Sequence, residues 1–312
     1  MIISASRRTD IPAYYSDWFY NRIKEGYVLV RNPMNFRQVS RIDLSPDIVD
    51  GIVFWTKNPL PMLSRLAELE KYMYYFQFTI TPYGDDIESN LSVKTDIISA
   101  FKRLTSAIGA ERVIWRYDPI LINPKYSMEF HIQAFEKLAA KLYQYTRKVT
   151  ISFVDVNYRG LKSHINELAL SKFPSELQME LSAALAKIAH SYGLEIDTCA
   201  EEMDLQQFGI NRACCIDGKL FEKLLGHSLN VKKDKFQRAE CGCASSIDIG
   251  MYNTCLHGCK YCYANYSKSS VNGNYAKHSP HSPLLIGEVE TDDKISERTF
   301  KPHRQAQLTL DS

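Results

Sequence analysis

The chain has 312 residues, of which 45% are hydrophobic and 24% are charged. This composition is ordinary for globular proteins, so it excludes a chain that is disordered throughout, and the length suits two domains or one barrel-sized domain with an extension. The 38 basic and 36 acidic side chains leave a formal net charge of +2, which gives no general support for binding to a polyanion.

Apolar, β-branched and aromatic runs of strand length recur along the chain. They predict strands over residues 2–5, 52–55, 75–80, 113–117, 149–154, 194–198 and 247–250. Segments with helical spacing lie between most of them, over residues 16–25, 60–72, 93–108, 128–145 and 175–192. This alternation predicts an α/β fold, a (β/α) barrel of about seven or eight parallel strands, with an open doubly wound sheet as the alternative.

We expect residues 1–266 to form this barrel domain and the polar residues 267–312 to form a partly irregular carboxyl-terminal extension. The apolar residues 283–286 either dock on the domain or belong to an irregular tail. The first residues lack a signal-peptide pattern, and no run of about 18 apolar residues occurs. The sequence therefore predicts a cytoplasmic protein with no membrane partner.

All eight cysteines lie in the last third or so of the chain, beginning at Cys199. In a long cytosolic chain such a set favours metal or redox chemistry over a disulfide framework. Cys255, Cys259 and Cys262 have the spacing C-x3-C-x2-C and follow the last predicted strand. Three soft thiolates at this spacing suit three corners of a [4Fe–4S] cluster and leave one iron open to another ligand.

With Tyr261 before its last cysteine, this triplet resembles the signature of the radical S-adenosylmethionine (SAM) superfamily. The resemblance implies that Cys255, Cys259 and Cys262 bind a [4Fe–4S] cluster whose open iron binds SAM. It also implies an electron donor such as flavodoxin or ferredoxin, and an enzyme that cleaves SAM reductively to start radical chemistry on an unknown substrate. His257, inside the same loop, is expected to be solvated, with donation to a cluster sulfur as the alternative.

The triplet normally follows the first barrel strand in that superfamily, whereas here it follows the last one. The first and last strands of a closed barrel are neighbours, so moving the chain break past one βα unit leaves the sheet unchanged. We therefore expect a circularly permuted barrel, complete or partial, in which residues 247–250 lie beside residues 2–5.

Most of the chain resembles a bacterial family of unassigned reaction that has a carboxyl-terminal cluster of this type. The similar segments are ISASRRTDIPAYY, FWTKNPLPML, YFQFTITPYG, VIWRYDPIL, DTCAEE, CGCASSIDIGMYNTCLHGCKYCYAN and SPLLIG. Two of them, FWTKNPLPML and WRYDPIL, are also distantly similar to the spore photoproduct lyase group, SAM enzymes that act on damaged DNA. This second likeness makes nucleic acid a candidate substrate and implies a SAM-binding role for Lys57, since the lysine of the strand-end TK pair contacts SAM in that group.

Three arginines follow predicted strands and are candidates for cofactor binding, namely Arg7, Arg8 and Arg116. A guanidinium group can bind a carboxylate or a phosphate through two parallel hydrogen bonds. The alternative is that Arg8 with Asp10, or Arg116 with Asp118, forms a salt bridge that stabilises the loops at the mouth of the barrel.

Four further cysteines are enough for a second site, either another [4Fe–4S] cluster or a structural zinc. They are Cys199, Cys215, Cys241 and Cys243. The alternative for Cys199 is a simple buried strand residue. Cys214 is left over, because neighbouring side chains of an extended backbone point to opposite sides.

A different combination of cysteines suits a single zinc ion, as one C-x-C pair and one C-x2-C pair. Those cysteines are Cys241, Cys243, Cys259 and Cys262. This alternative predicts a zinc-stapled βα protein without catalysis, which binds nucleic acid or a partner protein through Arg7, Arg8 and the tail.

Overall fold

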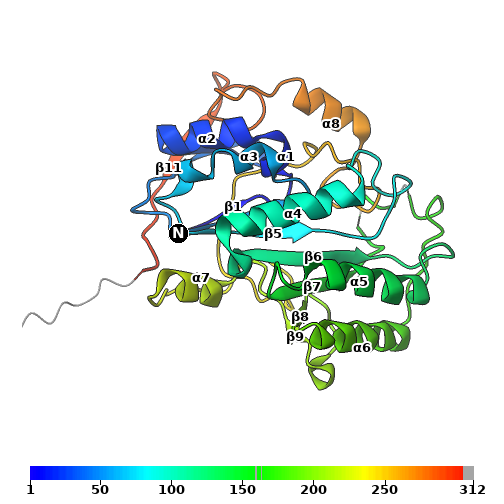
Figure 1. Ribbon diagram of the computed structural model, residues 1–312. Coiled ribbons are helices and arrows are strands. Elements are labelled where there is room, and N and C mark those ends of the chain that lie inside the picture. The colour runs from blue at the N-terminus through cyan, green and yellow to red at the C-terminus, as the bar shows by residue number, and fades with distance from the viewer. Residues whose placement is uncertain (159, 163, 305–312) are drawn as a thin grey trace, which may run out of the picture.

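Figure 1 shows the computed structural model, which describes residues 1–158, 160–162 and 164–304. Its main sheet has eight parallel strands in the order β10-β1-β4-β5-β6-β7-β8-β9. The strands are β1 (Ile2–Ala5), β4 (Gly51–Thr56), β5 (Tyr74–Thr79), β6 (Val113–Ile120), β7 (Lys148–Phe153), β8 (Glu195–Thr198), β9 (Asn211–Arg212) and β10 (Ile247–Asp248). The predicted parallel α/β architecture is confirmed, and only the two-residue β9 was not predicted.

The last strand of the main sheet lies where the permuted arrangement places it. Ile247 pairs with Ile3 and Asp248 pairs with Ser4, so β10 lies parallel to β1. Among the described strands, β10 and β9 stand at opposite ends of the sheet order, and closure into a barrel is not detected. The carboxyl-terminal loop with the cysteine triplet thus emerges next to the loop that follows β1.

Helices connect the strands on the outer side of the sheet (Figure 1). They are α1 (Ile11–Tyr14), α2 (Ser16–Glu25), α3 (Leu60–Leu63), α4 (Lys94–Ile108), α5 (Met128–Leu142) and α6 (Ser175–Ser191). Residues 60–72 were expected to form one helix but form α3 and the 3-10 turn η1 (Leu66–Leu69), because successive amide hydrogen bonds there span three residues and not four. Two further 3-10 turns are η2 (Ala110–Arg112) and η3 (Gln206–Phe208). None of the described helices is both long enough and apolar enough to cross a membrane.

The two faces of the main sheet pack against different elements, because alternate strand residues point to opposite sides of the sheet. The outer face packs against α2, α4, α5 and α6 and buries Phe54 and Trp115 completely. The inner face carries Val53 and Tyr75, which pack against Phe221 of α7 (Gly218–Leu225) and against three of the cysteines. The inner face therefore positions cysteine side chains as well as core residues.

A smaller sheet, which the sequence analysis did not predict, ties the extension to the domain. Its strands are β2 (Tyr27–Asn32), β3 (Asn35–Asp43) and β11 (Lys294–Arg298), in the order β11-β3-β2. The amide of Leu29 donates to the carbonyl of Pro283 at 3.0 Å, and Leu284, Leu285 and Ile286 are buried. The apolar residues 283–286 thus dock on the domain, after the short helix α8 (Lys268–Tyr275).

Candidate metal centre

The residues at the carboxyl ends of the strands surround a cavity of about 470 Å³. This volume is within the range of small-molecule and cofactor sites. The lining includes every residue that the sequence analysis assigned to the cluster, to the cofactor and to the second site: Cys255, Cys259, Cys262, Lys57, Arg7, Arg8, Arg116, Cys199, Cys215, Cys241 and Cys243. The structure therefore brings two groups of cysteines, which we call the trio (Cys255, Cys259, Cys262) and the quartet (Cys199, Cys215, Cys241, Cys243), to one cavity.

The loop of the trio is held in place by the loop that follows β5. The amide of Lys260 donates to the carbonyl of Ile87 at 3.0 Å, and the amide of Asn90 donates to the carbonyl of His257 at 3.1 Å. Gly258 has a φ of +68°, and a Cβ at this position would lie 2.5 Å from Oγ of Ser89. The loop therefore needs a glycine both for its left-handed backbone and for its close packing.

Burial controls the protonation of the trio. It raises the pKa of Cys255 well above its ordinary value, raises that of Cys259 to about 12, and raises that of Cys262. The thiols are therefore neutral without a metal, and a metal that binds them must displace three protons. Among the described residues, no three His, Cys, Asp or Glu side chains are grouped as they would be around a single ion. In a four-iron cluster each thiolate binds a different iron.

Lys57 lies in a buried ionic network that the sequence analysis missed. Its Nζ donates to Oε1 of Glu88 at 2.7 Å, and Nζ of Lys94 donates to Oε2 at 2.6 Å. The hydroxyls of Thr81 and Tyr261 also donate to Oε1. Burial alone would raise the pKa of Glu88, which is 2% exposed, but the two ammonium groups lower it to about 2. Glu88 thus fixes Lys57 beside the trio.

His257 is buried, so the prediction of a solvated histidine is wrong. Its Nε2 lies 2.7 Å from Oδ2 of Asp10, and the hydroxyl of Tyr14 lies 2.9 Å from its Nδ1. Oδ2 of Asp10 also accepts a hydrogen bond from the amide of Lys57 at 2.7 Å. Because both ring nitrogens have these partners, His257 joins three loops and has no nitrogen left for a cluster sulfur.

Asp248 joins β10 to the loop that follows β1. Its Oδ2 accepts from Oγ of Ser4 at 2.6 Å and from the amide of Arg7 at 2.9 Å. Its Oδ1 accepts from Oγ of Ser6 at 2.6 Å and from the amide of Gly250 at 3.0 Å. One carboxylate therefore satisfies four donors and sets the start of the trio's loop against the first strand.

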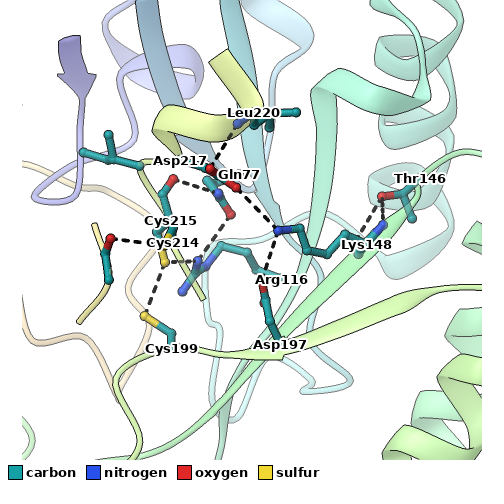
Figure 2. A network of polar contacts seen from close by, with 12 residues as sticks. Gln77, Arg116, Thr146, Lys148, Asp197, Cys199, Cys214, Cys215, Asp217 and Leu220 are labelled. Atoms are coloured by element: carbon teal, nitrogen blue, oxygen red, sulfur yellow. Dashed lines mark hydrogen bonds and ion pairs between the residues drawn. The ribbon is translucent and has the colours of Figure 1, made fainter. Parts of the chain in front are cut away.

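The quartet comes together from three separate segments, as Figure 2 shows for two of its members. Sγ of Cys199, after β8, lies 3.3 Å from Sγ of Cys215, which precedes α7. Cys215 also hydrogen-bonds to Cys243, and Cys243 to Cys241. These hydrogen bonds and the guanidinium of Arg116 hold the pKa of the Cys215 thiol well below its ordinary value.

Cys214 is placed as its position beside Cys215 predicts. Its Sγ donates to the carbonyl of Gly242 at 3.1 Å, and it does not line the cavity. The carbonyl of Cys215 accepts two hydrogen bonds from the inner face of the sheet, from the hydroxyl of Tyr75 at 2.8 Å and from Nε2 of Gln77 at 2.9 Å. The two adjacent cysteines are thus held with only Cys215 toward the cavity.

The guanidinium groups of the three arginines differ in how many of their donors are already paired within the protein. Nη1 of Arg116 donates to Sγ of Cys215 at 2.9 Å, and Nη2 forms the expected salt bridge with Asp118. Arg8 lies 4.0 Å from Asp248 and not beside Asp10, and it stacks over the ring of Tyr252. Nη2 of Arg7 donates to Oγ of Ser246 at 3.2 Å, while its buried Nε has no partner among the described residues. Their role in cofactor binding stays a prediction.

Comparison with known proteins identifies the family of this chain but does not identify a reaction that it catalyses. The family model described as "Domain of unknown function (DUF1848)" matches residues 2–264. No curated protein matches the chain. A Bacteroides thetaiotaomicron protein, whose crystal structure has the provisional description alpha-L-fucosidase, is 11% identical, with 73% of this chain and 83% of that chain covered. The TM-score of 0.26 supports no inference about this chain.

Proposed function

This chain belongs to the DUF1848 family, and we propose that it is a radical SAM enzyme that binds a [4Fe–4S] cluster through Cys255, Cys259 and Cys262. The main support is that all three thiols line one cavity, together with Lys57, at the carboxyl ends of a parallel sheet. When bound, such a cluster supplies the electron that cleaves the sulfonium of SAM and starts radical chemistry on a substrate. We infer a partial, circularly permuted barrel as the architecture.

The donor set of the trio fits a cluster with one open iron. Three thiols are offered by one loop, and soft sulfur ligands suit iron–sulfur clusters. All three are half-buried in the wall of the cavity, which partly screens an oxygen-sensitive group from solvent. The loop has its own backbone partners on the loop after β5, so contacts within the protein hold the backbone that carries the three cysteines.

Lys57 is the residue we propose to face the carboxylate of SAM. Its ammonium is 2.7 Å from Glu88, and it also lies 5.6 Å from the centre of the Tyr261 ring. A compact cation suits a carboxylate ligand, and Glu88 holds that cation at the wall of the cavity. The charge of Glu88 is shared with Lys94, so the network carries a net positive charge that can attract an anionic group.

Asp10 and His257 hold the loops of the site in place through hydrogen bonds. Asp10 accepts from the amide of Lys57 and lies against His257, so it connects the loop after β4 with the loop of the trio. Tyr263 adds a contact to the loop after β1, where its hydroxyl donates to the carbonyl of Arg7 at 2.6 Å. These bonds keep Lys57 and the trio at a fixed separation.

Release of 5′-deoxyadenosine tests the proposal. We expect the protein, reconstituted anaerobically with iron and sulfide and then given dithionite and SAM, to release it, and we expect Cys259→Ala to reduce the release to background. Cys214→Ala is the matched control, because Cys214 does not line the cavity, and it should release as much as the parent protein.

Two results would contradict the proposal. One is a cluster-loaded protein that leaves SAM intact. The other is stoichiometric zinc without iron in anaerobically purified protein, which would favour the zinc-stapled binding protein. Adding nucleic acid or small metabolites to the active protein, and measuring methionine release, would then separate these two candidate substrate classes.

A further inference from the structure

We propose that Cys199, Cys215, Cys241 and Cys243 bind a second iron–sulfur cluster, ligated by four thiolates, in the wall of the same cavity. This inference does not rest on SAM cleavage, since it concerns residues that the proposed function does not use. The quartet is thus assigned as the ligand set of an iron–sulfur centre.

The first argument is convergence from distant segments. The four thiols come from the end of β8, from the segment between β9 and α7, and from the loop before β10. Nevertheless, Sγ of Cys199 and Sγ of Cys215 are 3.3 Å apart, and hydrogen bonds continue from Cys215 to Cys243 and Cys241. Free cysteines that serve only as small hydrophobic residues have no need to meet one another. Four that meet at a cavity wall form a set of metal ligands.

The second argument is that the protein fixes the backbone of the quartet. The carbonyl of Cys215 accepts from Tyr75 and Gln77, two strand residues of the inner face. The amide of Ile216 donates to Sγ of Cys243 at 3.4 Å, an N–H···S bond of the kind that stabilises metal-bound thiolates. These contacts position the thiols as pre-arranged ligands.

The third argument is charge (Figure 2). Four thiolates with a cluster carry a net negative charge, which needs compensation when it is buried. Arg116, 5% exposed, donates to Cys215, and Arg7 lines the same cavity as the quartet. The buried Nε of Arg7 has no partner among the described residues, so it is available to donate to a cluster sulfide. The quartet thus has two cations and one unused donor beside it.

The shape of the site favours a cluster over a zinc ion. Around one tetrahedral ion, each thiolate contacts the other three and the ligands close over the metal. In the quartet the described contacts form a row, from Cys199 through Cys215 and Cys243 to Cys241, and all four members line the open cavity. Ligands spread along a wall leave room for a group larger than an ion, and Sγ of Cys199 and Sγ of Cys215 move apart from 3.3 Å when each binds its own iron. Because four thiolates fill the coordination of all four irons, this cluster would transfer electrons and would not bind SAM.

Metal analysis after anaerobic reconstitution tests this inference. We expect about eight irons and eight sulfides per chain in the parent protein, and about four of each when all three trio cysteines are changed to Ala. Replacing all four quartet cysteines by Ser should also leave about four, whereas Cys214→Ser should keep about eight. After reduction, the trio variant should keep an electron paramagnetic resonance signal of a four-iron cluster.

The trio variant keeps the inference falsifiable even if the quartet variant does not fold. If the trio variant, shown to be folded by circular dichroism, holds no iron, the inference is wrong. It is also wrong if the folded trio variant holds one zinc and no iron. Because none of these measurements uses SAM, they are independent of the test of the proposed function.

Discussion

The trio and the quartet line the same cavity but are built in different ways. The trio lies on one loop, between residues 255 and 262, whereas the quartet spans three segments between residues 199 and 243. The trio is supported by a buried carboxylate, Glu88, which holds Lys57, and the quartet is supported by a buried guanidinium, Arg116, which contacts a sulfur. The difference shows that candidate ligands on one loop share a recognisable spacing, whereas only the fold can show that candidate ligands on several segments come together.

The largest expected effect comes from removing the carboxylate of Glu88, which supports the trio, while Arg116, which supports the quartet, is left unchanged. Glu88→Gln leaves the buried ammonium of Lys57 and the half-buried ammonium of Lys94 without a carboxylate, so we expect it to lower the free energy of unfolding by about 3–5 kcal/mol. Urea denaturation measures this loss, and iron analysis should show that the trio loses metal more readily than the quartet.

Glu167→Gln is the matched control for that substitution. Glu167 also binds two basic side chains, Lys260 and His164, but its side chain is 49% exposed, whereas that of Glu88 is buried. We expect no measurable change in unfolding. Equal losses in the two variants would remove the distinction between the buried support of the trio and ordinary surface pairs.

A smaller effect, on the pH dependence of the free energy of unfolding, tests whether the trio and the quartet both depend on the stability of the main sheet. His131 is fully buried between Tyr117 and the carbonyl of Leu121, and burial lowers its pKa from 6.5 to about 4. The unfolded chain therefore binds one more proton between these values, so stability should be complete above pH 6.5 and fall by up to about 3 kcal/mol as the pH drops to 4. His131→Gln should remove this pH dependence from the unfolding free energy. If the slope persists in the variant, another group causes it.

Lowering the pH from 6.5 to 4 also allows iron release from the trio to be compared with iron release from the quartet. Because α5, which carries His131, packs on the outer face of the sheet that positions both groups, we expect iron to leave the trio and the quartet together in this pH range. Iron release followed by absorbance, in the parent protein and in the trio variant, measures this. Loss from only one group would show that the two groups do not share one cooperative unit.

The smallest expected effects come from two glycines, one beside each group. Gly258→Ala places a Cβ in a left-handed conformation 2.5 Å from Oγ of Ser89, so we expect a loss of about 1–2 kcal/mol and weaker iron binding by the trio. Gly242→Ala places a Cβ 2.7 Å from Sγ of Cys214, so it should weaken iron binding by the quartet instead.

Gly226→Ala is the control for backbone strain alone. Gly226 has a φ of +75°, and a Cβ there would meet nothing within 4 Å. We expect a similar loss in unfolding free energy to that of Gly258→Ala, with iron binding unchanged. If Gly226→Ala also weakens iron binding, general strain and not local packing explains the effect.

The sequence predicted the parts of the fold that have strong periodicity. Seven strands of the main sheet and the long helices were predicted because their apolar residues repeat with the period of the element. The antiparallel hairpin of β2 and β3 was missed, because along β3 only Val39 and Ile42 are buried and the alternation is weak. The pairing of β10 with β1 was predicted from the position of the trio and not from periodicity.

The candidate site was predicted as a set of ligands but not as a network. The trio has a motif, and all eleven predicted residues line the cavity. Glu88 and Asp248 were missed because their partners are far along the chain: Lys57 is 31 residues from Glu88, and Ser6 is 242 residues from Asp248. No local pattern can show which carboxylate will meet which donor at such separations. For the same reason, the burial of His257 against Asp10 was not foreseen.

The bond from Asp248 to the first strand has a consequence for biosynthesis. A ribosome makes β1 and the rest of the main-sheet scaffold before it makes β10 and the trio. A nascent chain therefore lacks the trio until late in translation, and the strand that carries it must then be captured at the free edge of β1 by Ser4 and Ser6. Any metal that the trio binds must therefore bind late, after the other strands of the main sheet have been synthesised.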